Sequence, residues 1–122
     1  MDRRSRGRMA QITGQAAENR IALDYERRGF AVDGRRWRGS AGEIDLIARG
    51  PEGLVFIEVK KSRSFAAAAE RLGRRQMDRI CAAASEFLAG EPAGQLTASR
   101  FDVALVDGAG NFEILENAFG VN

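Results

Sequence analysis

Residues 42–60, GEIDLIARGPEGLVFIEVK, constrain the fold of this chain most strongly, because two apolar runs flank a short turn-forming segment. Both runs have the aliphatic and aromatic composition that is typical of strands, and residues 50–53, GPEG, favour a four-residue hairpin loop. Arg49 then pairs with Leu54, and the residue numbers of every cross-strand pair sum to 103. The turn therefore predicts the register of the whole hairpin.

One face of this hairpin is predicted to be wholly apolar. Successive side chains of a strand point to opposite faces, so alternate residues of both strands share this side. The pairs on it are Ile44 opposite Val59, Leu46 opposite Ile57, and Ala48 opposite Val55. We expect a helix or a second sheet to cover this face.

The other face becomes charged toward one end, where Asp45 is predicted opposite Glu58 and Glu43 opposite Lys60. Two carboxylates directly opposite each other destabilise a sheet by roughly 0.2–1 kcal/mol, so folding alone does not explain the pair. A divalent cation such as Mg²⁺ removes this penalty, because it prefers oxygen ligands. Lys60 could then steady an attacking hydroxide or a charged transition state. The pattern predicts a metal-dependent phosphodiesterase site.

A Glu-x-Lys triplet is also common on exposed strands, where alternating charges form a solvated face. Here the triplet follows residues 54–57, LVFI, and encloses Val59, which indicates a buried strand. Charges at the end of a buried strand, beside an aspartate of the next strand, favour the functional interpretation.

At 122 residues and 44% hydrophobic content, the chain is long enough for one globular domain. Its formal net charge is only +2, yet arginines cluster within residues 3–8, 27–38 and 71–79. Such clusters favour a nucleic acid or another polyanion as partner. We expect residues 1–12 to form a flexible basic tail and residues 13–122 to form the domain.

The chain has no histidine, which removes the commonest general base and the usual zinc ligand. A metal-activated hydroxide is therefore the expected nucleophile. The single cysteine, Cys81, falls in an apolar helical stripe, where core packing is expected rather than nucleophilic chemistry. No apolar run approaches a membrane span and the basic start lacks the hydrophobic segment of a signal peptide, so we expect a cytoplasmic protein.

A first helix is predicted from Thr13, which caps it, to Arg28, with Gly29 ending it. Its buried stripe consists of Ala17, Ile21, Ala22 and Tyr25. Glu18 falls within this stripe at helical spacing, where a carboxylate is costly without a partner. Two interpretations are open: Glu18 is a third acid that reaches the site, or it forms an ion pair with a nearby arginine.

A second long helix is predicted at residues 74–88, after a shorter segment at residues 65–72. Its apolar stripe consists of Met77, Ile80, Cys81, Ala84, Phe87 and Leu88. Backbone N–H groups at the start of this helix favour anions. We expect Arg75 or Arg79 to hold phosphate and Gln76 to orient a water or the substrate; the alternative is an ordinary charged helix surface.

Further strands are predicted at residues 30–37, with an interruption at Gly34, and at residues 100–106 and 111–115. Trp37 either stacks on a base or packs at a sheet edge, and Asp102 is interpreted as structural. The loop 38–42 either admits a phosphate backbone or simply connects two strands. The order of helix, three strands, helix and two strands predicts an α/β fold with a central mixed sheet flanked by helices.

With Asp45, Glu58 and Lys60 placed, the pattern resembles the PD-(D/E)xK superfamily of restriction-endonuclease-like nucleases. More narrowly, the chain resembles the small bacterial YraN-type family of endonuclease-like proteins. The residues that carry this resemblance are Glu18 and the segments 29–30, 42–48, 55–60, 100–103 and 117–119. Ala17 and the pair Lys61-Ser62 depart from the pattern, but they do not replace an expected metal ligand.

The resemblance implies a restriction-endonuclease-like fold in the order α-β-β-β-α-β-β, with a core sheet of four strands, similar to archaeal Holliday-junction resolvases. It implies that Asp45 and Glu58 bind Mg²⁺ or Mn²⁺, with the Val59 carbonyl as a further ligand. Lys60 would position the nucleophile or stabilise charge, and Glu18 matches the assisting acid that related nucleases supply from their first helix.

The expected activity is hydrolysis of DNA phosphodiester bonds, on branched or single-stranded DNA, in recombination or repair. The residues expected to contact substrate are Arg38, Lys61, Arg75, Gln76 and Arg79. Analogy with junction enzymes implies a homodimer. The alternative is a non-catalytic module on the same fold that binds DNA or docks a protein partner, since the basic clusters support both.

Overall fold

The computed structural model describes residues 13–119, so the predicted tail at residues 1–12 lies outside the described residues. The elements are helix α2 (Gly14–Arg27), strands β1 (Ala31–Arg38), β2 (Glu43–Gly50) and β3 (Gly53–Lys61), helices α3 (Phe65–Glu70) and α4 (Arg74–Leu88), the short 3₁₀ helix η1 (Gly94–Leu96), and strands β4 (Ser99–Val106) and β5 (Phe112–Phe119). Helix α2 starts as predicted, because the Thr13 side chain accepts a hydrogen bond from the Ala16 amide. It ends where Gly29 adopts a φ of 97°.

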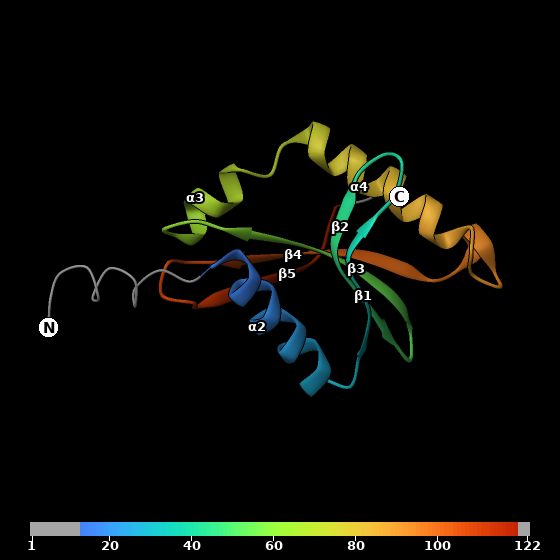
Figure 1. Cartoon of the computed structure of the whole chain (residues 1–122), viewed down its shortest axis with the longest axis horizontal. Coiled ribbons are helices and arrows are strands. Elements are labelled where there is room, and N and C mark those ends of the chain that lie inside the picture. Colours follow the sequence, from blue (N-terminus) through green and yellow to red (C-terminus); the bar gives the residue numbers. More distant parts are fainter. Residues whose placement is uncertain (1–12, 120–122) are drawn as a thin grey trace, which may run out of the picture.

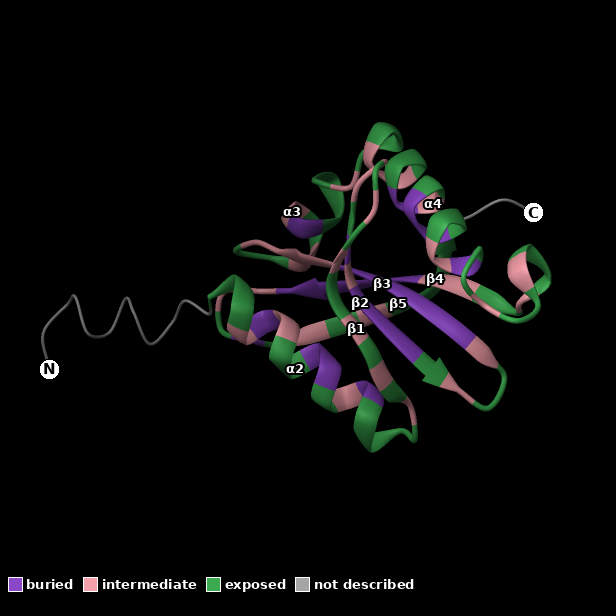
Figure 2. Cartoon of the chain, turned by 45° about the vertical axis from the view of Figure 1, so that its right-hand side comes forward, coloured by how far each residue is buried: buried purple, intermediate pink, exposed green. Residues whose placement is uncertain are grey.

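The strands form one mixed sheet in the order β1-β2-β3-β4-β5. Strands β3 and β4 are parallel, joined through α3 and α4, and the other neighbours are antiparallel. Helix α2 packs on one face, while α3 and α4 pack on the other (Figure 1). Figure 2 shows burial concentrated along the central strands β3 and β4, with more exposure on the edge strand β1. The predicted α/β class and element order are confirmed, with five strands rather than the four implied for the core.

The predicted hairpin register is confirmed from Gly50–Gly53 to Leu46–Ile57. Leu46, Ala48, Val55 and Ile57 pack under α2 as expected. The expectation for Ile44 is wrong, because Ile44 joins Ile47 in the cluster under α4. The regular pairing of β2 and β3 ends at Leu46–Ile57. Beyond it, the Val59 amide donates to the Asp45 carboxylate at 2.8 Å instead of to a backbone carbonyl of β2, so strand alternation no longer places Ile44.

Two other expectations need correction. Strand β5 runs on to Phe119 instead of ending at residue 115, because the Asn117 amide donates to the buried Asp102 carboxylate at 2.9 Å and holds the bulged strand in the sheet. Between α4 and β4, where no helix was predicted, the chain forms η1. Trp37 packs edge-to-face on Phe87 with ring centroids 5.4 Å apart, which is the edge-packing alternative.

Within residues 13–119, no helix is long and apolar enough to cross a membrane.

Candidate metal centre

Asp45 and Glu58 meet at the end of the β2–β3 hairpin, where the paired ladder stops. Only 4% of Glu58 is exposed to solvent, while Asp45 is half-buried. Burial, followed by a hydrogen bond with the Asp45 carboxyl and the charge of Asp45, raises the pKa of Glu58 to about 9, against the opposing effects of Lys60 and Gln76. Without a cation, the pair therefore retains a proton at neutral pH.

Lys60 and Gln76 complete this cluster from two different elements. The Lys60 ammonium on β3 donates to the Gln76 side-chain oxygen at 2.8 Å and lies 3.7 Å from a Glu58 carboxylate oxygen. The Gln76 amide, in the first turn of α4, donates to the same Glu58 oxygen. Gln76 thus holds both the Lys60 ammonium and the Glu58 carboxylate in place. These two hydrogen bonds join the hairpin to α4.

These side chains border an open cavity of about 260 Å³, which is lined by Gly42, Glu43, Asp45, Glu58, Gln76, Arg79 and Ile80. Gly42, immediately before β2, lies close to α4, because a Cβ atom there would be in van der Waals contact with Arg79 at 3.4 Å. The preceding loop is fixed to α4, because both the amide and the hydroxyl of Ser40 donate to Glu86. The loop is therefore an anchored wall of the cavity.

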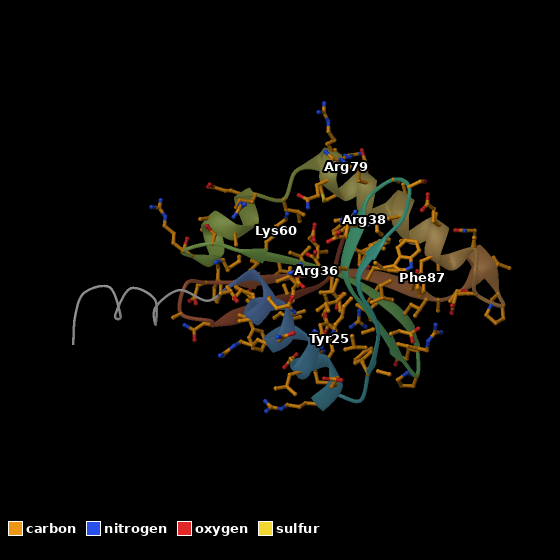
Figure 3. All side chains as sticks on the ribbon, in the orientation of Figure 1. Tyr25, Arg36, Arg38, Lys60, Arg79 and Phe87 are labelled. Carbon is orange, nitrogen blue, oxygen red and sulfur yellow. The ribbon has the colours of Figure 1, made fainter. Side chains whose placement is uncertain are left out.

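Glu18 adopts the ion-pair alternative. Its carboxylate lies 3.0 Å from the Arg36 guanidinium on β1, and 12% of its side chain is exposed. Sequence reasoning missed Arg36, which is labelled in Figure 3. Its φ of 48° marks an irregular point in the strand. The carboxylate of Glu18 raises the pKa of Arg36 most, and Glu43 and Asp45 add smaller effects. Arg36 therefore interacts electrostatically with Glu18 and, more weakly, with Glu43 and Asp45.

The other predicted substrate contacts divide into two groups. Arg79 and Gln76 line the cavity, whereas Arg38 and Arg75 are exposed outside its lining, with Arg38 paired to Glu43 at 3.2 Å. The Lys61 carbonyl accepts a hydrogen bond from Arg71. The backbone amide of Val59 donates a hydrogen bond to the Asp45 carboxylate. A role for its carbonyl stays a prediction.

Comparison with known proteins identifies the family. Residues 17–106 match the sequence model of the uncharacterised protein family UPF0102. The chain belongs to this family. It is 65% identical over 116 residues to a UPF0102 protein from Ruegeria pomeroyi, covering 95% of this chain and 94% of the relative. A UPF0102 protein from Cereibacter sphaeroides is 66% identical over 113 residues, which cover 93% and 97% of the two chains.

UPF0102 is the YraN-type family predicted from the sequence. Among solved structures, the crystal structure of a repair endonuclease from Pyrococcus abyssi is similar with a TM-score of 0.45 and 18% sequence identity. The alignment covers 80% of this chain and 41% of that one.

The donor atoms at the UPF0102 cavity fit a hard divalent cation. Asp45 and Glu58 offer carboxylate oxygens, and the chain has no histidine. Across the described range 13–119, no three Asp, Glu, His or Cys side chains gather as a metal cluster. Two carboxylates suit Mg²⁺ or Mn²⁺, because Mg²⁺ commonly binds through one or two carboxylates and completes its shell with water and phosphate oxygens.

Proposed function

We propose that this UPF0102 protein is an endonuclease that uses Mg²⁺ or Mn²⁺ to hydrolyse DNA phosphodiester bonds. The supporting observation is that a buried Glu58, an adjacent Asp45 and the ammonium of Lys60 meet at an open cavity. A buried carboxyl with a raised pKa makes the fold less stable at neutral pH than a neutral side chain at the same position would. Folding alone therefore does not explain the acid pair. A perturbed carboxyl in a cleft beside a lysine is a frequent property of active sites.

Each side chain has a distinct role in this proposal. Asp45 and Glu58 would hold the cation, which supplies Lewis-acid activation of water and charge neutralisation at the phosphate. Lys60, kept in place by Gln76, would orient the nucleophile or stabilise charge that develops on the phosphate oxygens. Arg79 at the rim would contact a phosphate of the DNA backbone. Glu18 would assist, directly or through water, once it leaves Arg36.

One observation favours a second function, a DNA-binding or partner-docking module with little catalysis. Glu18 is paired with Arg36 and Glu43 with Arg38, and no three acidic side chains gather as a metal cluster within the part of the chain that the structure describes. Calorimetric titration with Mn²⁺ separates the two functions, because a pure binding module does not need a divalent site.

The direct test is nicking of supercoiled plasmid and cleavage of four-way junctions and single-stranded circles, each with Mn²⁺. Asp45→Asn and Lys60→Met should lower the rate by about a hundredfold or more, the size typical for loss of one transition-state contact. Glu113→Gln, on the exposed part of β5, is the control and should cleave at the wild-type rate. Unchanged cleavage by both site variants would contradict the proposal. Light scattering of the same preparations tests the implied homodimer.

A further inference from the structure

A second cavity, of about 490 Å³, lies at the opposite end of the hairpin from the carboxylate pair. It is bordered by the hairpin turn, the end of α2 and the start of β4. Gly53, in its wall, is five residues from Glu58 along β3, a separation of about 17 Å in an extended strand. The residues that line it differ from those that line the carboxylate cavity. It is therefore a separate site.

Arg100 is fixed at one side of this cavity. Its Nε and Nη2 atoms donate to the two oxygens of Asp102 at 3.0 and 3.3 Å. Asp102 is fully buried and also accepts the Tyr25 hydroxyl at 2.6 Å and the Asn117 amide at 2.9 Å. These bonds hold the Arg100 guanidinium, 28% of whose side chain is exposed, in one orientation at the cavity wall. Arg100 is thus a preorganised cation.

Arg28 stands on the other side, immediately after the last turn of α2. Its guanidinium lies 4.4 Å from the centre of the buried Tyr25 ring, and its Nε donates to Asp24 at 3.0 Å. The guanidinium carbons of Arg28 and Arg100 lie 5.8 and 5.9 Å from the centre of the Phe30 ring. Two arginines are therefore held beside one aromatic ring in the same cavity.

Glu116 on β5 occupies the position between these two arginines. Its carboxylate oxygens lie 3.6 Å from Arg28 Nη1 and 3.9 Å from Arg100 Nη2, and 57% of its side chain is exposed. Well-formed hydrogen bonds between guanidinium and carboxylate are about 2.7–2.9 Å long. The Glu116 carboxylate thus bridges two cations without closing tightly on either, and solvent can reach it.

We propose that this cavity binds the phosphate of a phosphate monoester, which displaces Glu116 and bridges Arg28 and Arg100. A monoester carries close to two negative charges and three terminal oxygens, so one group can bond to both guanidiniums at short distance. The cavity volume falls within the range of about 300–1,000 Å³ found for sites that hold small ligands. Two sources share this chemistry: a free nucleoside monophosphate and the 5′-phosphorylated end of a nucleic-acid strand.

The test is calorimetric titration in EDTA, so that the proposed metal site does not contribute. The probes are inorganic phosphate, adenosine 5′-monophosphate, and one oligonucleotide with and without its 5′-phosphate. Arg28→Ala should weaken monoester binding by about tenfold or more, as expected for loss of a charge-assisted hydrogen bond. Glu116→Gln should strengthen it several-fold, because it removes the competing carboxylate. Arg27→Ala, the same change one residue earlier and outside the cavity, is the control.

Tighter binding of the monophosphate by Glu116→Gln, with a loss in Arg28→Ala that Arg27→Ala does not share, supports the proposal. The site is assigned to strand ends if the 5′-phosphorylated oligonucleotide binds more tightly than both the 5′-hydroxyl oligonucleotide and the free monophosphate. Absence of saturable binding of every probe by Glu116→Gln overturns it, as do equal losses in the Arg27 and Arg28 variants. Arg28→Lys keeps the charge beside Asp24 and Tyr25, and its lower monoester affinity would show that the bidentate fork matters.

Discussion

Replacing Glu58 with Gln should make the metal-free protein more stable at neutral pH, although the residue is buried at the centre of the candidate site. In the folded chain, burial and the neighbouring Asp45 raise the pKa of Glu58 from 4.5 to about 9. The group is therefore protonated at pH 7.5 in the folded state and ionised in the unfolded state. Stability from this group is fully present below about pH 4.5 and is lost as the pH rises toward 9.

The size of the effect follows from that shift. Between pH 4.5 and 7.5 the titration of Glu58 lowers the free energy of unfolding by at most about 4 kcal/mol, at roughly 1.36 kcal/mol per pH unit. Asp45 is only half-buried, so solvent screens part of its interaction, and we expect about half of this limit. Glutamine has the shape of the protonated acid and can keep hydrogen bonds with Asp45 and Gln76. A gain of about 2 kcal/mol corresponds to a rise in Tm of roughly 8 °C for a domain of this size.

Urea unfolding in EDTA at pH 5.5 and 7.5 measures this effect directly. The stability gain of Glu58→Gln should be clear at pH 7.5 and smaller at pH 5.5, and Glu113→Gln should show neither change. Mn²⁺ at a hundred times its Kd should stabilise the wild type by about 2.7 kcal/mol and have little effect on Glu58→Gln. If Glu58→Gln is less stable than the wild type in EDTA at pH 7.5, the reasoning about the buried pair is refuted.

Further outcomes follow from the same contacts. The affinity for Mn²⁺ should rise with pH between 6 and 8, approaching tenfold per pH unit, because Glu58 must lose its proton when the metal binds. Calorimetry at several pH values measures this affinity. A Kd that does not change with pH would show that the pair is already ionised. Lys60→Met should lose nicking activity but bind Mn²⁺ at least as tightly as the wild type, whereas Asp45→Asn should lose both, as comparison of cleavage with calorimetry will show. Tyr25→Phe removes the 2.6 Å hydrogen bond to Asp102 and should lower the free energy of unfolding by about 1–3 kcal/mol in urea titration, without changing Mn²⁺ affinity.

Local patterns were sufficient to predict the hairpin. The GPEG turn and the alternation of side chains specify its register, and the structure has the predicted pairs from Gly50–Gly53 to Leu46–Ile57. Where the ladder stops, these rules no longer apply. Ile44 was assigned to the wrong face because the Asp45 side chain accepts the Val59 amide, a contact that depends on three-dimensional placement rather than on strand periodicity.

Contacts between distant segments could not be predicted in this way. The sequence left Glu18 with two interpretations, and its pairing with Arg36 depends on an irregular backbone at Arg36 and on how α2 packs across β1. The extension of β5 depends on a hydrogen bond from Asn117 to a buried acid of the neighbouring strand. The pair of arginines at the second cavity joins α2 to β4, with a carboxylate from β5 between them. None of these contacts has a short-range sequence signal.

The central claim is that Asp45 and Glu58 bind the same divalent cation. Diffraction from crystals soaked in Mn²⁺ at pH 8, recorded at a wavelength where manganese scatters anomalously, tests it most directly. We predict one anomalous peak between the two side chains, about 2.0–2.3 Å from an oxygen of each. A peak bound by only one of them, or a site without a peak at saturating Mn²⁺, would contradict the claim.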